Sequence, residues 1–134
     1  MTPIKNSHFD LVKSYLLDLN IPITYESQKD SILVVSRESD GINNLILGIA
    51  TPILIMEQHI FDIKNPTVTL LSDLLKKNRD MVHGAFVLDQ TGCKVIFRDT
   101  LQLENLDLNE FEASLNSLSL VLSEYSENII NYSK

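Results

Sequence analysis

Five carboxylates in the last third of the chain are the side chains best placed for acid–base chemistry. They are Asp99, Glu104, Asp107, Glu110 and Glu112. Two neighbouring carboxylates can act as general acid and base when burial raises the pKa of one of them. These residues also precede or begin a predicted helix, where negative side chains favour the positive end of the helix dipole. We therefore interpret them as helix-start residues, and a small carboxylate-dependent enzyme is the less favoured alternative.

The other reactive residue types form no catalytic or metal-binding motif. Cys93 is the only cysteine, lies in a predicted turn and has no histidine close in sequence to act as its base. His8, His59 and His83 lack the paired spacing of metal ligands. No two of the four glycines have phosphate-loop spacing. We predict no catalytic residue, no cofactor and no metal, and hence that the protein is not an enzyme.

Length and composition indicate one folded domain in a reducing compartment. A chain of 134 residues has the usual size of a domain, and 44 % apolar with 22 % charged residues is ordinary for a globular protein. A lone cysteine cannot form an internal disulfide, and the first residues, Met1 to Lys5, lack the basic and apolar segments of a signal peptide. We expect residues 1–134 to form a single α+β domain in the cytoplasm.

Charge and hydropathy argue against two classes of partner. The formal net charge is −7, whereas nucleic-acid-binding proteins gain affinity by neutralising phosphates with Lys and Arg. The longest uncharged run, Leu45 to Met56, has about a dozen residues, and a membrane-spanning helix needs about 20. We therefore expect neither a nucleic acid nor a membrane as partner.

Apolar spacing and turn residues predict an α+β fold with an antiparallel sheet and helices. Helices are expected over about 7–19, 65–78 and 107–132, the second opening at Asn65-Pro66 and the third capped by Asp107. Strands are expected over 23–27, 32–35, 45–50, 53–56, 84–88 and 94–97, with turns at 39–41 and 89–93. The expected order is α-β-β-β(-β)-α-β-β-α.

The last predicted helix carries an apolar seam. Its members follow one another at alternating spacings of 3 and 4: Leu108, Phe111, Leu115, Leu118, Leu122, Tyr125, Ile129 and Tyr132. A coiled coil usually has charged flanks beside such a seam. Serines flank it here, so we interpret it as core packing. Leu120 lies almost opposite the seam and marks a contact surface if it joins Ala113 and a neighbouring element.

Two predicted strands, 45–50 and 53–56, barely alternate between apolar and polar residues. A strand with one solvated face alternates, so both faces of this part of the sheet should meet apolar groups. Few helices are predicted, so a second subunit or a bound partner is expected on one face. The candidate contact residues are Ile53, Leu54, Ile55, Met56, Leu70 and Leu74, together with Leu120. The alternative is that these residues belong to the core.

A family resemblance begins at residues 74–89, which read Leu-Leu-Lys-Lys-Asn-Arg-Asp-Met-Val-His-Gly-Ala-Phe-Val-Leu-Asp. It continues over 97–110 as Phe-Arg-Asp-Thr-Leu-Gln-Leu-Glu-Asn-Leu-Asp-Leu-Asn-Glu. The pattern resembles the YbjN-like family, bacterial proteins related to type III secretion chaperones of the Tir-chaperone kind. It consists of a helix ending in Leu-Leu-x-x-Asn, a Gly-x-Phe-x-Leu-Asp strand, a second strand and a long capped helix.

The resemblance implies a type III secretion chaperone-like fold, usually in a homodimer, with a role in holding partner proteins or in regulation. Residues 44–62 hold one strand more than the minimal layout of these chaperones. Our leading hypothesis is a cytoplasmic, non-catalytic adaptor that binds a segment of another protein by strand addition or in an apolar groove. The alternative is a regulatory module that binds a folded partner, for example in sensory or stress signalling.

Overall fold

The computed structural model describes residues 7–134, so the prediction for Met1 to Lys5 lies outside the described residues. The elements are α1 (Ser7–Asp18), β1 (Ile23–Ser27), β2 (Ile32–Arg37), the short 3₁₀ helix η1 (Glu38–Asp40), β3 (Ile42–Ala50), β4 (Ile53–Asp62), α2 (Val68–Asn78), β5 (Ala85–Leu88), β6 (Lys94–Gln102), α3 (Leu108–Glu124) and α4 (Ser126–Tyr132). The predicted α+β element order is confirmed, including the additional strand before the second helix.

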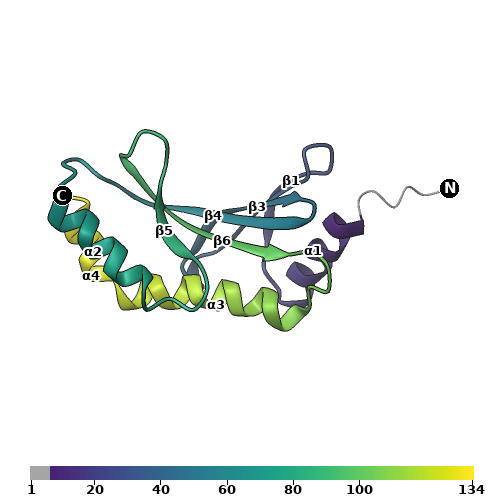
Figure 1. Cartoon of the computed structure of the whole chain (residues 1–134). Helices are drawn as coiled ribbons and strands as arrows, with labels where there is room; N and C mark the ends of the chain where they lie inside the picture. The colour runs from purple at the N-terminus through teal and green to yellow at the C-terminus, as the bar shows by residue number, and fades with distance from the viewer. Residues whose placement is uncertain (1–6) are drawn as a thin grey trace.

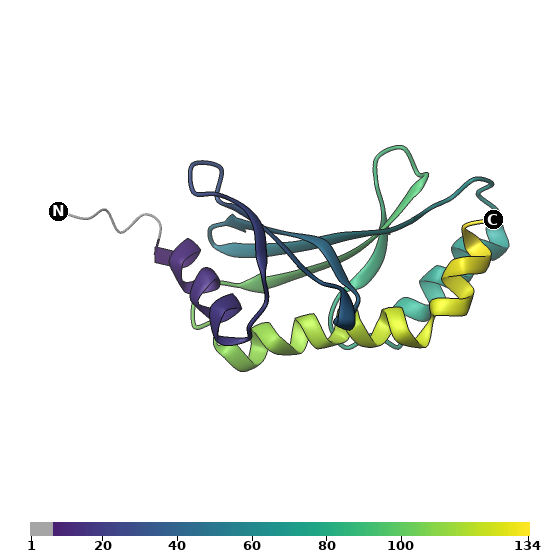
Figure 2. The same cartoon turned by 180° about the vertical axis from the view of Figure 1, so that it is seen from behind.

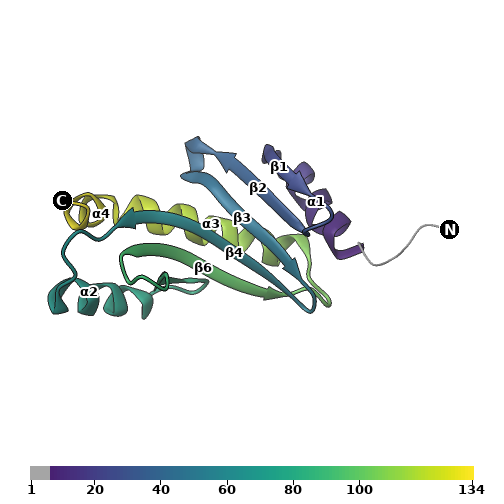
Figure 3. The same cartoon turned by 90° about the horizontal axis from the view of Figure 1, so that it is seen from above.

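The six strands form one antiparallel sheet in the order β1-β2-β3-β4-β6-β5. Helices α1 to α4 lie on the same side of this sheet (Figures 1 and 2). Seen from above, the long helix α3 passes beneath the strands (Figure 3). The sheet therefore has one face packed on helices, and within residues 7–134 no helix covers the other face.

The core lies between the helices and the packed face of the sheet. Successive side chains of a strand point to opposite faces, so every second residue enters this layer. Leu33, Leu47 and Phe97 are fully buried there. They meet Phe111 and Leu118 of α3, which are also fully buried. The seam of the last helix is therefore core packing, as predicted.

The prediction of one continuous last helix was wrong. Tyr125, with φ −106° and ψ 16°, separates α3 from α4. The Ser126 hydroxyl donates a hydrogen bond to the Ser123 carbonyl, a local bond that competes with the helical pattern. The bend brings Tyr132 to Phe61 of β4, with ring centroids 5.6 Å apart.

Helix caps account for the starts of α2 and α3. α2 begins later than predicted, because Thr67 is its cap: the Thr67 hydroxyl accepts a hydrogen bond from the Leu70 amide at 3.1 Å. The predicted Asp107 cap of α3 is confirmed, since its carboxylate accepts a bond from the Glu110 amide at 2.7 Å. Threonine and aspartate favour this position because their oxygens satisfy amides that lack a helical partner.

Candidate functional site

Apolar side chains occupy much of the face of the sheet that carries no helix. Val34 and Ile46 are directly paired across β2 and β3, and Gly48 lies between Ile32 and Ile55. Ile46 keeps 46 % of its surface exposed. The apolar members of this face, which we name the open sheet face, are Tyr25, Ile32, Val34, Ile46, Ile53, Ile55, Val87 and Ile96. Contiguous exposed apolar residues of this kind mark interaction sites.

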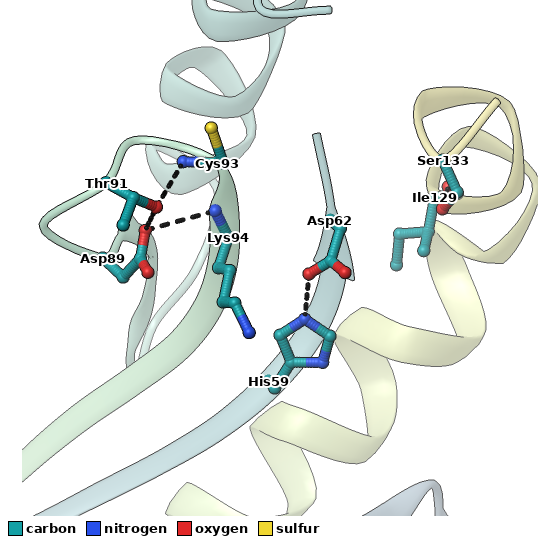
Figure 4. Close-up of polar contacts among 8 residues, drawn as sticks. All are labelled: His59, Asp62, Asp89, Thr91, Cys93, Lys94, Ile129 and Ser133. Carbon is teal, nitrogen blue, oxygen red and sulfur yellow. Dashed lines mark hydrogen bonds and ion pairs between the residues drawn. The ribbon is translucent and has the colours of Figure 1, made fainter. Parts of the chain in front are cut away.

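Charged pairs interrupt the open sheet face on β4 and β6, where Glu57 is paired with Ile46 of β3 and His59 with Ile96 of β6. Arg98 and Glu57 form a cross-strand ion pair with a nitrogen–oxygen distance of 2.7 Å. Nearby on β4, His59 Nε2 and Asp62 Oδ1 lie 2.7 Å apart (Figure 4). Exposed pairs of this kind contribute at most about 1 kcal/mol to stability. Their main effect is to limit where an apolar partner can lie.

The predicted contact residues divide between surface and core. Ile53 and Ile55 are half-buried and point to the open sheet face. Leu54 and Met56 alternate with them, are buried and point to the helices; Met56 Sδ lies 3.4 Å from the Ser114 hydroxyl oxygen of α3. Both therefore belong to the core and are not contact surface. Successive side chains of β4 still point to opposite faces of the sheet, although the residues on both faces are apolar.

Helix α2 shows the same division. Leu74 is buried, so it belongs to the core and is not the contact surface predicted for it. Leu70 is half-buried. Sequence reasoning missed Leu75, which is 70 % exposed although it is the neighbour of Leu74. Leu120 is 63 % exposed and lies on the solvent side of α3. The residue pattern alone does not say which of two adjacent leucines faces the sheet.

An apolar groove lies between α2 and the β5–β6 hairpin. It encloses about 360 Å³, and the residues lining it, which define the α2–β5 groove, are Leu71, Leu74, Leu75, Asn78, Phe86, Val87, Leu88 and Val95. Leu88 is 43 % exposed at its mouth. Asn78 is the only polar side chain in this lining. The groove is therefore fitted to an apolar group and not to a polar substrate.

Asn78 fastens α2 to the edge strand β5. Its amide group donates to the Phe86 carbonyl at 3.0 Å and accepts from the Phe86 amide at 2.7 Å. Gly84, with φ +80°, turns the chain into β5 directly against the ring of Phe97. The Leu-Leu-x-x-Asn and Gly-x-Phe motifs therefore have a structural explanation: a buried leucine, a side-chain clasp and a turn.

A polar cluster joins α4 to α2. The Tyr132 hydroxyl donates a hydrogen bond to the Asp73 carboxylate, and Lys77 Nζ lies 3.3 Å from the same carboxylate. These bonds, that from Tyr132 above all, hold the pKa of Asp73 below its usual value. Burial opposes the charge on Lys77, but its bonds to Tyr132 and Asp73 outweigh burial and raise its pKa. Lys77 also lies over the ring of Tyr125.

The cluster predicts a specific dependence of stability on acid. A carboxylate with a lowered folded pKa stabilises the fold above its unfolded pKa of about 3.9, and this contribution is lost as the pH falls through the folded pKa. We expect the wild-type protein to lose more unfolding free energy than Asp73→Asn between about pH 5 and pH 3. The difference should stay under about 1 kcal/mol, because the Asp73 side chain is 42 % exposed. Urea unfolding at several pH values measures it, and identical pH slopes would contradict the role of Asp73.

Two of the five candidate catalytic carboxylates have structural roles. Asp107 caps α3, and Asp99 accepts a hydrogen bond from the buried Ser114. Cys93 is exposed in the β5–β6 turn, where its amide donates to the Thr91 hydroxyl (Figure 4). Within residues 7–134, no three His, Cys, Asp or Glu side chains converge in the way a metal site requires. No helix in that range is both long and apolar enough to span a membrane.

Comparison with known proteins agrees with this architecture. The family model CesT_Tir_1, which describes type III chaperones, matches residues 5–134. The chain belongs to the CesT_Tir_1 family. The resemblance inferred from residues 74–110 is thereby confirmed. No curated protein sequence matches this CesT_Tir_1 chain.

Three solved structures show how widely the CesT_Tir_1 fold is shared. YbjN, a proposed transcription regulator from E. coli, is 15 % identical, with a TM-score of 0.70 over 90 % of this chain and 92 % of its own. A chain of the HopA1–SchA chaperone–effector complex is 13 % identical, with a TM-score of 0.65 over 99 % and 98 %. A chain of the complex of the Yersinia pestis type III secretion chaperone SycH with a fragment of YscM2 is 17 % identical, with a TM-score of 0.60 over 94 % of this chain and 99 % of its own. At these identities the likeness establishes the fold.

Proposed function

We propose that residues 1–134 act as a single chaperone-like unit that works as a homodimer in the cytoplasm and binds a segment of another protein without catalysing a reaction. The open sheet face is the observation that most supports this function. Aliphatic side chains lie side by side on neighbouring strands there, and burying them against a partner is favourable by about 25 cal/mol per Å². Family membership adds support, because structures of similar fold include a chaperone–effector complex and a secretion chaperone with a bound fragment.

The edges of the sheet restrict how a partner segment binds. A partner strand can extend a sheet only where the edge backbone groups are available. At Phe86 of β5 both groups are bonded to Asn78. Strand addition is therefore assigned to the opposite edge, β1, and the apolar side chains of an added strand would continue onto Tyr25 and Val34 of the open sheet face.

A second copy of the chain is assigned to the α2–β5 groove. Leu75 and Leu88 expose apolar surface on its two walls. A two-fold interface brings the same patch of both copies together, so that one exposed leucine wall covers the other. Apart from Val87, which belongs to both surfaces, this arrangement leaves the open sheet face of each copy available for the partner protein.

An exchange of one residue on the open sheet face tests the binding function. Ile46→Asp places a new charge directly beside Val34, and we expect capture of partner protein from native bacterial lysate to fall at least tenfold. Leu17→Asp, on α1, is the matched control, because Leu17 is also exposed and lies on the helical side of the sheet. Its capture should equal that of the wild-type protein.

Protease protection of the captured partner then distinguishes the two binding functions. Protection of one short, otherwise cleavable segment supports the chaperone-like adaptor. Protection of a folded domain, at one partner per chain, supports the regulatory module instead. Full capture by a correctly folded Ile46→Asp protein would overturn the assignment of the open sheet face.

A further inference from the structure

A second groove lies between α3 and the connection from α2 to β5. It encloses about 340 Å³. We name it the α3 groove, and the residues lining it are Asp80, Met81, Val82, His83, Ala113, Asn116, Ser117, Leu120, Val121, Glu124 and Tyr125. The structure thus brings Leu120 and Ala113 together with a neighbouring element, which is the condition that the sequence set for a contact surface.

The apolar part of the α3 groove is unusually exposed. Val82 keeps 89 % of its surface and Leu120 keeps 63 %, one on each side of the groove. Between them, Val121 is buried and Met81 is half-buried against the core. Two large exposed apolar side chains facing one hollow are uncommon unless an apolar group fills it.

Hydrogen bonds hold the two walls of the α3 groove in place. The Ser117 hydroxyl donates to the His83 carbonyl at 2.7 Å, which ties α3 to the connection. The Met81 amide donates to the Asn78 carbonyl at 3.2 Å, which ties the connection to the end of α2. The groove is therefore formed before any partner arrives, which lowers the entropic cost of binding.

The lining of the α3 groove carries net negative charge. Asp80 and Glu124, both exposed, are the only carboxylates in its lining, and His83 is its only basic side chain. Lys77, which lies over the Tyr125 ring, is paired with Asp73. Burial, followed by the charges of Glu124 and Asp80, raises the pKa of the Tyr125 hydroxyl.

The chain segment that contains α3 and α4 has the same sign of charge. From Asp99 to Ser133 the chain contains no Lys or Arg but seven carboxylates: Asp99, Glu104, Asp107, Glu110, Glu112, Glu124 and Glu127. The other eleven acidic residues are matched in number by the eleven Lys and Arg residues, so the net charge of −7 resides in this stretch. Such a concentration of charge attracts and orients a cationic partner.

We propose that the α3 groove binds a basic apolar segment of a partner protein, in which leucine-like side chains are flanked by Lys or Arg. The apolar side chains lie between Val82 and Leu120, and the cations lie beside Asp80 and Glu124. The inference rests on the protein-binding function proposed above and adds a second contact of defined chemistry. The partner's contact with the open sheet face is apolar, whereas this contact is apolar and cationic.

A labelled synthetic peptide tests the α3 groove directly. The probe is an eight-residue fluorescein-labelled peptide, Lys-Leu-Lys-Leu-Leu-Lys-Leu-Lys, and fluorescence anisotropy measures its dissociation constant. We expect Leu120→Asp to weaken binding at least tenfold and Val82→Ser to weaken it severalfold. Leu17→Asp, whose leucine is 62 % exposed on α1, should bind the peptide like the wild-type protein.

Charge variants separate the groove from the overall charge of the chain. Asp80→Asn with Glu124→Gln should weaken binding severalfold and reduce its dependence on salt. Asp18→Asn with Glu38→Gln removes two other exposed acids and should leave the affinity unchanged. Peptides with Ser in place of Leu, or Glu in place of Lys, should bind at least tenfold more weakly than the probe.

Several results would overturn the inference. Absence of peptide binding at millimolar protein would do so, as would equal binding by a Leu120→Asp protein with wild-type circular dichroism. Equal weakening by the two pairs of charge variants would show attraction by net charge alone. Ile46→Asp separates this inference from the proposed function, because that variant should keep peptide binding even where it loses partner capture.

Discussion

Replacing Gly84 by alanine should destabilise the fold by roughly 3 kcal/mol or more, through backbone strain and overpacking together. Gly84 has φ +80°, a conformation that costs an alanine about 1 kcal/mol. A Cβ atom there would lie 2.3 Å from Cζ of Phe97 and 2.8 Å from its Cε1. Phe97 is fully buried between the sheet and α3, so its ring cannot turn away without disturbing the core.

Gly92→Ala is the matched control for this effect. Gly92 has φ +76°, nearly the same as Gly84, but a Cβ atom there meets nothing within 4 Å. Gly92→Ala should therefore lose only the free energy of unfolding that the backbone strain costs, about 1 kcal/mol. Urea unfolding of both variants gives the comparison. Equal losses would show that the Phe97 ring adapts and that the approach of Gly84 to it is not important for stability.

Leu75→Asp combined with Leu88→Asp should convert the proposed homodimer into a monomer. A carboxylate on each wall of the α2–β5 groove would be buried without a partner charge when two copies meet, which costs several kcal/mol. A loss of about 3 kcal/mol weakens the dimer about a hundredfold. The mass from light scattering should then fall from twice the chain mass to the chain mass of 15.2 kDa.

Both leucines are exposed in the single chain, so the variant should keep its fold, which circular dichroism checks. Leu17→Asp should remain dimeric, because its side chain lies on α1 and does not line the groove. A dimer that survives the double exchange would place the second copy elsewhere. Loss of the dimer in Ile46→Asp would then show that the two copies meet through the open sheet face.

Most of the fold follows from local sequence signals. Turn residues separated the strands correctly, and the Asp107 cap and the seam of α3 were identified because each depends on neighbours a few residues away. The errors lie where local signals compete. Asn65-Pro66 is a good helix start, yet Thr67 caps α2. The serines before and after Tyr125 allow a bend that the regular spacing of leucines conceals.

The candidate surfaces were less predictable, because exposure depends on distant parts of the chain. The unusual apolar content of β3 and β4 correctly indicated a sheet with two apolar faces. It did not indicate that Leu54 and Met56 would be core while Ile53 and Ile55 point outward, since that depends on the register with β6 and on which side the helices lie. Similarly, Leu120 shares its groove with residues 80–83, which lie about forty positions earlier in the sequence, so local spacing could not indicate this contact.

The clasp of Asn78 on Phe86 has a consequence for how copies of this chain behave when crowded. Exposed strand edges are templates on which identical chains stack into fibrils, and a protein with an uncovered aliphatic sheet face is especially prone to this. On the β5 side, stacking would first require both bonds between Asn78 and Phe86 to break. A single amide side chain therefore protects one border of the sheet from fibril growth, while the apolar face remains accessible.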